Sequence, residues 1–149
     1  SYILDNNGTL FSFGRNGEGV LGIQSNSVDT SDILRKVLNG INVIQFGCGI
    51  YHMGILTGKH EVYMFGGNGC SQCGYKGGRK PELSYKGNKI ILNNEIITDI
   101  KCGGAHNIIK TNKDNYYSFG YDLHNQLLIE SNNFSKIAKP TLIDKEYLA

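Results

Sequence analysis

Three short motifs in the sequence carry residue types that do chemistry in other proteins. Residues 17–22 fit the G-x-G-x-x-G pattern that holds the pyrophosphate of a dinucleotide. Cys70 and Cys73 have the spacing of thiols that bind zinc or exchange disulfides. His52 and His106 supply imidazoles, the most common general bases in enzymes. Cofactor binding, metal or thiol chemistry and nucleophilic catalysis therefore all have to be weighed.

A fourth feature is a basic segment at residues 76–89. It carries five cations and a single carboxylate, Glu82, and it interleaves them with Tyr75 and Tyr85. Cations beside aromatic rings suit an acidic protein surface, a phosphate or a nucleic acid. The competing interpretation is a solvated, mobile loop, because most charged runs are of that kind. The cations that we predict as a partner-binding set are Lys76, Arg79, Lys80, Lys86 and Lys89.

The elements that carry these motifs repeat at intervals of 52 and 54 residues. Cys48 and Cys102 each lie 18 residues before the glycine of a matching aromatic–glycine pair. Offsets that agree to the residue indicate a true internal repeat, and we call residues at equivalent places in the copies a column. The aromatic–glycine pairs are Phe13 and Gly14, Phe65 and Gly66, and Phe119 and Gly120.

Each copy has the two-residue period of a β-hairpin. Alternate aromatic residues such as Phe11 and Phe13 share one face of a strand, which allows the sheet to pack against another sheet. A single helical turn is expected at most, at residues 31–34. Polar hairpin turns are expected at residues 5–8, 57–60 and 112–115. Further strands are expected before the hairpin at residues 41–46 and 96–100, and after it at residues 34–38, 89–92 and 141–143.

About four strands in each repeat of about 50 residues are typical of a β-propeller blade. We therefore predict an all-β fold in which three repeats of about four antiparallel strands form a partial β-propeller. The predicted organisation is one domain over residues 1–149. Its repeat units are expected at about 1–40, 41–94 and 95–149.

The repeat changes the interpretation of the glycine motif. A dinucleotide site needs a helix directly after the glycines, with its N-terminus at the pyrophosphate. Residues 23–28 are instead polar and strand-like, and Gly69 and Gly74 repeat the spacing of Gly17 and Gly22 without a cofactor motif. The sequence therefore predicts turns here and no cofactor.

The cysteines and histidines also favour structural roles. A structural zinc site needs four ligands, but Cys48 and Cys102 belong to separate repeats and are expected to lie apart from Cys70 and Cys73. Cys73 stands in an apolar column with Leu21, which predicts a buried thiol that packs as a small hydrophobe. The two histidines of the Cys-Gly-x-x-His runs share one column. A catalytic base occurs once per site rather than once per repeat, so hydrogen-bonded structural imidazoles are expected.

The composition bounds the class of protein. The chain has 149 residues, a formal net charge of +2, 40% hydrophobic residues and 19% charged residues, which together exclude a disordered chain. So small a charge argues against a dedicated nucleic-acid binder. No apolar run reaches the length of a membrane span, so we expect no membrane insertion.

After each hairpin the chain continues in a glycine-rich loop, most clearly at residues 13–22. With the Cys-Gly-x-x-His runs, these loops resemble the repeat of the regulator of chromosome condensation family. The family pattern is a Cys-Gly and His strand, a Thr-x-Asp-Gly turn, an aromatic residue and Gly, then Asn and Gly-Gln-Leu-Gly. The resemblance spans essentially the whole chain. It departs from the pattern at the usual Trp, which is Phe in all copies, and at Val20, Cys73 and Leu128, which replace Gln, Leu and the last Gly.

The resemblance implies a seven-bladed propeller, and a propeller needs at least about four blades to close. We therefore expect either an arc of a longer propeller or a ring that a second copy or a partner chain completes. Ser1 falls just after the place of the first expected His, which favours an arc cut from a longer chain.

The predicted function is a protein-interaction module that binds partners through loops on a rigid propeller face. The alternative that the resemblance implies is guanine-nucleotide exchange on a small GTPase of the Ran type, although no exchange motif stands out. The sequence predicts no catalytic, cofactor-binding or metal-binding residue, and thus a non-enzyme with protein partners. Unpaired cysteines favour a reducing compartment, so an intracellular location, cytoplasmic or nuclear, is expected.

Overall fold

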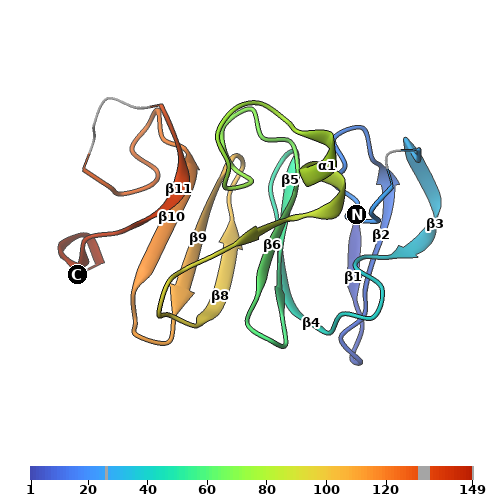
Figure 1. Ribbon diagram of the computed structural model, residues 1–149, viewed down its shortest axis with the longest axis horizontal. Helices are drawn as coiled ribbons and strands as arrows, with labels where there is room; N and C mark the ends of the chain where they lie inside the picture. The colour runs from blue at the N-terminus through green and yellow to red at the C-terminus, as the bar shows by residue number, and fades with distance from the viewer. Residues whose placement is uncertain (26, 131–134, 149) are drawn as a thin grey trace.

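The computed structural model describes residues 1–25, 27–130 and 135–148, and most of its elements are β-strands. The strands form three antiparallel sheets in which neighbours in the chain are neighbours in the sheet. The sheets stand one beside another along the molecule (Figure 1). We call them blade 1, blade 2 and blade 3 in chain order. The prediction of an all-β fold made of antiparallel blades is confirmed.

The strands of each blade follow the order of the chain. Blade 1 contains β1 (Tyr2–Leu4), β2 (Leu10–Arg15) and β3 (Thr30–Lys36). Blade 2 contains β4 (Val43–Cys48), β5 (His52–Thr57), β6 (Val62–Gly66) and β7 (Asn88–Ile90). Blade 3 contains β8 (Ile97–Cys102), β9 (His106–Thr111), β10 (Tyr116–Tyr121) and β11 (Lys136–Leu142). Two short helices, α1 (Pro81–Lys86) and the 3-10 helix η1 (Lys145–Leu148), accompany them.

The repeated columns correspond to repeated backbone geometry. The hairpin-turn column of Gly8, His60 and Asp114 has φ values of 79°, 60° and 55°, the left-handed conformation that tight turns need. Glycine is required at the aromatic–glycine step for a second reason. A Cβ built on Gly120 would lie 2.6 Å from the carbonyl oxygen of Ala105, because the neighbouring strand passes against it.

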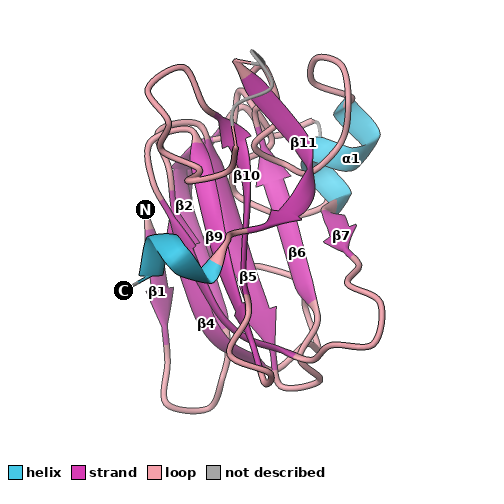
Figure 2. Cartoon of the chain, turned by 90° about the vertical axis from the view of Figure 1, so that its left-hand side faces the viewer, coloured by secondary structure: helices cyan, strands magenta, loops and turns pink. Residues whose placement is uncertain are grey.

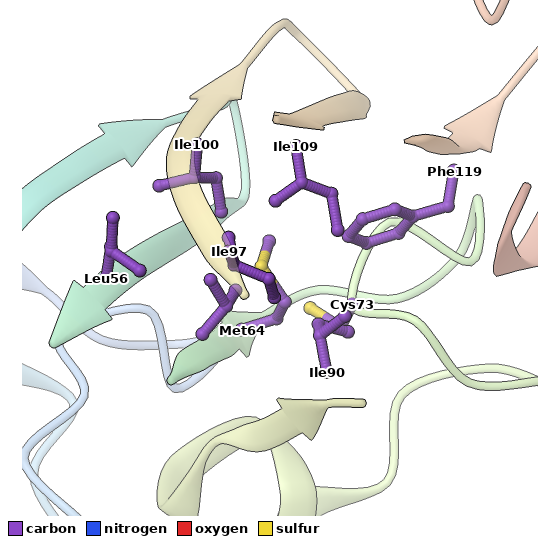
Figure 3. Close-up of a cluster of buried hydrophobic side chains, with 9 residues drawn as sticks. Leu56, Met64, Cys73, Ile90, Ile97, Ile100, Ile109 and Phe119 are labelled. Carbon is purple, nitrogen blue, oxygen red and sulfur yellow. The ribbon is translucent and has the colours of Figure 1, made fainter. Parts of the chain in front are cut away.

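The hydrophobic core lies between the blades in two layers. One layer joins Leu10 and Val37 of blade 1 to Ile55 and Phe65 of blade 2. The other joins blade 2 to blade 3, where Phe119, Ile97, Ile100 and Ile109 pack on Met64, Cys73 and Ile90 (Figure 3). Stacked sheets whose inner faces interdigitate in this way are the packing expected of propeller blades.

Two local predictions were wrong. The helical turn expected at residues 31–34 is part of β3, because the Asn16 N–H donates to the Asp29 carbonyl at 2.7 Å and brings the chain alongside β2 from Thr30 onward. Residues 76–89 are not a single loop, since they contain α1 and the start of β7. Pro81 opens the helix, and Gly87, with a φ of 89°, ends it by donating to the Leu83 carbonyl at 2.8 Å.

The two ends of the sheets differ. Short hairpin turns lie at one end, and the long loops that follow β2, β6 and β10 gather at the other (Figures 1 and 2). The tight turns between β4 and β5 and between β8 and β9 also lie at the long-loop end. We call this end the loop face. No helix in the described part of the chain is long and apolar enough to cross a membrane.

Candidate protein-interaction site on the loop face

Each long loop is organised around one buried side chain in a single column. Asn68 is fully buried, and its Nδ2 donates to the carbonyls of Tyr75 and Gly77 at 2.8 and 2.9 Å. Its Oδ1 accepts the Cys73 N–H at 2.9 Å. One amide thus ties together both sides of the loop. Because buried polar groups need partners, these bonds fix the loop in one conformation.

The other two blades repeat this arrangement with one difference. Asn16 donates to the Val28 carbonyl at 2.7 Å and accepts the Leu21 N–H at 3.0 Å. Asp122 accepts the Leu127 N–H at 2.9 Å. An ionised carboxylate has no N–H, so Asp122 cannot donate to carbonyls on the other side of its loop as the two asparagines do. The family pattern marks this column only as Asn. Its role as the central support of each loop is a feature that the sequence pattern alone does not reveal.

The imidazole of His52 connects blade 2 to blade 3. It is fully buried, and its Nε2 lies 2.8 Å from Oδ1 of Asn107 in β9. The Asn107 amide is oriented by its own donation to the Gln72 carbonyl at 2.6 Å, so Oδ1 faces the ring and Nε2 must carry the proton. Burial lowers the pKa of His52 below its ordinary value. The prediction of a hydrogen-bonded structural histidine is confirmed at this position.

The glycine of the Cys-Gly-x-x-His run is explained by the same ring. A Cβ built on Gly49 would overlap the His52 imidazole, and a Cβ on Gly103 would overlap His106. Each ring therefore lies directly over the glycine of its own run. Burial also lowers the pKa of the half-buried His106. Among the described residues, neither imidazole has a Ser, Thr or Cys side chain as a hydrogen-bond partner.

The cysteines are placed as packing residues. Cys73 is fully buried in the layer between blades 2 and 3, and its thiol donates to the Gly67 carbonyl at 3.3 Å. Burial raises the pKa of Cys73 above its ordinary value and that of Cys102 to about 12, which disfavours the reactive thiolate. Within the described ranges no three His, Cys, Asp or Glu side chains are grouped so that they could hold a metal ion.

The five predicted partner-binding cations are exposed, but they do not form one cluster. Lys89 pairs with Glu61 of the β5–β6 hairpin at 2.6 Å, away from the loop face. Arg79 reaches blade 1, where its Nη1 donates to the Gly17 carbonyl at 2.6 Å and its Nε lies 3.8 Å from Glu18. The ammonium of Lys80 lies 5.6 Å from the centre of the Tyr75 ring.

Lys76 and Lys86 lie on opposite sides of this segment. Lys76 borders a groove of about 600 Å³ that runs along β11, with Lys136 and Lys139 among its lining residues. Lys86 borders a smaller hollow of about 440 Å³ between α1 and Gln24 of blade 1. The basic segment therefore bridges all three blades. The five cations are close together in the sequence, but the sequence could not show that Lys86 and Lys89 would be separated from the other three in the fold.

Helix α1 fixes the basic segment to its neighbour. A Cβ built on Gly19 of the blade 1 loop would lie 2.9 Å from Tyr85 and 3.0 Å from the Ser84 backbone. Both α1 residues are buried by this contact and by the rest of the packing around the helix. The segment thus rests on blade 1 as well as on its own blade, which presents Lys76, Arg79 and Lys80 on a supported surface.

Comparison with known proteins identifies the repeat. The Regulator of chromosome condensation (RCC1) repeat matches residues 7–56, which run from the β1–β2 turn of blade 1 into β5 of blade 2. Human RCC2 is 31% identical over 127 residues, a match that covers 85% of this chain and 24% of RCC2. Human HERC4, a probable E3 ubiquitin-protein ligase, is 30% identical over 129 residues, which cover 85% of this chain and 12% of HERC4.

Solved structures agree in fold at low sequence identity. Human WBSCR16 superposes with a TM-score of 0.81 at 16% identity, over 99% of this chain and 36% of that protein. Yeast RCC1 (Prp20), solved with Kap60, gives a TM-score of 0.76 at 18% identity, over 96% of this chain and 34% of its own. The chain spans a quarter or less of these curated relatives and about a third of these solved proteins. Because the matched repeat and the solved folds agree with the blades described above, residues 7–56 are an RCC1 repeat and the three sheets form an RCC1-repeat fragment of a β-propeller.

Proposed function

We propose that this chain acts as a protein-interaction scaffold whose loop face binds partners, and that it is not an enzyme. The observation that carries the proposal is the basic segment, which is braced against blade 1 by Arg79 and α1 and leaves Lys76 and Lys80 exposed. Loops held on a rigid sheet framework are common binding surfaces, because little conformational freedom is lost when a partner docks.

We further propose that residues 1–149 form a single partial propeller domain that needs more blades, from a longer chain or from a second copy. Cys48 and Cys102 share a column, yet Cys48 is exposed while Cys102 packs against blade 2. A Cβ built on Gly47 would lie 3.0 Å from the Cys102 thiol. Blade 1 has no strand matching β4 among the described residues, so nothing equivalent to Gly47 covers Cys48. A strand placed beside β1 would supply that cover.

A second candidate is guanine-nucleotide exchange on a small GTPase of the Ran type. It is favoured by the likeness to Saccharomyces cerevisiae Prp20p, which is described with its binding properties to Gsp1p and histones. At 18% identity that match shows the fold alone, and the GTPase is carried to this chain only as a proposal. The four unpaired cysteines support an intracellular location, in the cytoplasm or the nucleus.

An exchange assay separates the two candidates. A Ran-type GTPase loaded with fluorescent GDP is mixed with the chain, and both nucleotide release and binding are followed. Binding without faster release supports the scaffold, whereas accelerated release supports the regulator.

Charge reversal tests the surface itself. We expect the combined variant Lys76→Glu, Arg79→Glu and Lys80→Glu to weaken binding of a protein partner by about tenfold or more, since several charge contacts are lost together. A matched control reverses Lys36, Lys59 and Lys113, which lie away from the loop face, and should bind normally. Unchanged partner affinity in the loop-face variant would remove the basic segment from the proposal.

A further inference from the structure

Ile50 and Tyr51 form an exposed apolar pair in the turn between β4 and β5 on the loop face. Their exposed fractions are 70% and 62%. Large apolar side chains that project side by side into water are unfavourable unless a partner covers them. We call these two residues the apolar pair.

The exposure of the apolar pair does not come from an uncovered end of the arc. The pair belongs to blade 2, which has blade 1 on one side and blade 3 on the other (Figure 1). The Ile50 N–H donates to the Gly104 carbonyl of blade 3 at 2.9 Å, and the Gly67 N–H donates to the Tyr51 carbonyl at 2.7 Å. Blade 3 and the loop after β6 of the same blade therefore already hold the backbone of this turn, and its side chains still face solvent.

The fold itself does not require bulky residues here. The matching turn of blade 3 has Gly104 and Ala105 in the same columns. It keeps the same hydrogen bonds, since Gly103 donates to the His106 carbonyl at 2.8 Å as Gly49 does to that of His52. A turn that folds with Gly and Ala does not need the large side chains of Ile and Tyr. Tyr is also a residue type enriched in the energetic centres of protein interfaces.

The apolar pair is contiguous with the basic segment. A Cβ built on Gly67 would lie 3.2 Å from Tyr51 and 3.6 Å from the Glu18 carboxylate, which Arg79 approaches at 3.8 Å. Asn68, the next residue, holds the chain on both sides of Lys76. On the other side, the Lys136 ammonium donates to the Gly69 carbonyl at 3.2 Å. The apolar pair therefore lies within a surface that also carries Lys76, Lys80 and Lys136.

The charges of this surface select the chemistry of the occupant. Lys76, Lys80 and Lys136 are exposed cations, and Glu18 is already approached by Arg79. A partner with carboxylates would find favourable charges around the apolar centre, whereas a basic partner would be repelled.

We propose that the apolar pair is the anchor of a docking site for an acidic protein segment. A large apolar side chain of that segment contacts Ile50 and Tyr51, and its carboxylates bind Lys76, Lys80 and Lys136. This inference rests on the proposed function of the loop face as a protein-binding surface. It adds the chemistry of the partner and the residues that anchor it.

The test uses the variant Ile50→Gly with Tyr51→Ala, which gives blade 2 the turn residues of blade 3. Because blade 3 already folds with these residues, the variant should keep its thermal unfolding temperature. Two fluorescein-labelled peptides are titrated by anisotropy: one has a Leu-Phe pair between runs of Glu, and the other has Ser-Ser in its place. We expect the double variant to bind the Leu-Phe peptide about tenfold more weakly than the natural chain. Its affinity for the Ser-Ser peptide should be unchanged, and Tyr51→Ala alone should show a smaller loss.

The possible failures can be told apart. Equal affinity of the natural chain and the double variant for the Leu-Phe peptide, or equal affinity of the natural chain for both peptides, overturns the anchor. If charge reversal at Lys76, Arg79 and Lys80 still abolishes peptide binding in that case, the proposed function stands without the anchor. Absence of binding to either peptide overturns the acidic-segment inference, while the GTPase assay still tests the scaffold.

Discussion

Leu128 holds a backbone conformation that glycine holds in the other two copies of its column. Its φ is 52°, against 62° at Gly22 and 83° at Gly74. A side chain with a Cβ is strained in this left-handed region, by roughly 1–2 kcal/mol. Leu128 is 41% exposed, so the packing of its side chain offsets only part of the backbone strain. The departure from the repeat pattern at this position is therefore a local weakness of blade 3.

We expect Leu128→Gly to stabilise the chain. Relief of strain outweighs the extra freedom that glycine gives the unfolded state, for a net gain of about 0.5–1 kcal/mol. For a chain of this size, thermal unfolding followed by circular dichroism should then rise by about 1–4 °C. The control is Asn125→Gly, also in a left-handed turn at a φ of 57°, where Asn is already well tolerated and little should change. A lower unfolding temperature for Leu128→Gly would show that its side chain packs better than its exposure indicates.

At the residue scale, the sequence predicted positions better than roles. Turn residues such as His60 and the glycines of the loops were recognised because backbone conformation depends on local residue type. The central role of Asn68 was not predicted, because its partners Tyr75 and Gly77 are defined only once the loop closes. The link from His52 to Asn107 joins residues 55 positions apart, and no local pattern specifies it.

At the scale of elements, strands β5 and β9 are connected by the same pair of residues. The Nδ1 of His52 is buried and has no hydrogen-bond partner among the described atoms. Protonation would place a donor and a positive charge where nothing accepts them, which is consistent with the lowered pKa. The neutral ring is thus part of the contact between blade 2 and blade 3.

We expect this contact to make stability depend on pH. Because the pKa of His52 is lower in the folded chain than in the unfolded chain, the unfolded state binds more protons over the intervening pH range. Stability should be full above about pH 6.5, the ordinary value for His, and should fall as pH decreases toward the folded pKa, by at most about 1.4 kcal/mol per pH unit.

Urea unfolding at a series of pH values from neutral to mildly acidic measures this dependence. His52→Gln should flatten the slope, leaving the part due to His106, whose pKa is also lowered. His124→Gln, which changes an exposed loop residue, should keep the natural slope. A slope that survives in His52→Gln and disappears in His106→Gln would assign the effect to blade 3 instead.

The elements themselves were largely predictable, since hairpins with a two-residue period depend on local pattern. Helix α1 was not expected because it has six residues and forms by resting on Gly19 of another blade. The early start of β3 has a similar cause, since hydrogen bonds from Asn16 guide the chain to it. Elements that depend on tertiary contacts are the ones that local pattern cannot supply.

At the scale of the whole molecule, the burial of the phenylalanine in the aromatic–glycine column shows which blades are covered by a neighbour. Phe65 and Phe119 are fully buried because each packs on the preceding blade. Phe13 occupies the same column in blade 1, but it is only half-buried and belongs to neither core layer. Phe13 therefore lies on the outer face of blade 1, at the position where Phe65 and Phe119 pack on a preceding blade. Among the described residues, none covers Phe13 in the way that blade 1 covers Phe65.

The three phenylalanines form a matched series that measures this uncovered face. Truncating a fully buried Phe to Ala costs about 3–5 kcal/mol, so Phe65→Ala and Phe119→Ala should both lower the free energy of unfolding by that amount. Phe13→Ala should cost about 1 kcal/mol, because most of its packing partners are missing. Urea unfolding of the three variants gives the costs, and light scattering at the same protein concentrations gives the molar mass.

An equal cost at Phe13, together with a mass that doubles as concentration rises, would mean that a second copy covers blade 1 in solution. A small cost at constant monomer mass would mean that this face of blade 1 stays uncovered in the 149-residue chain.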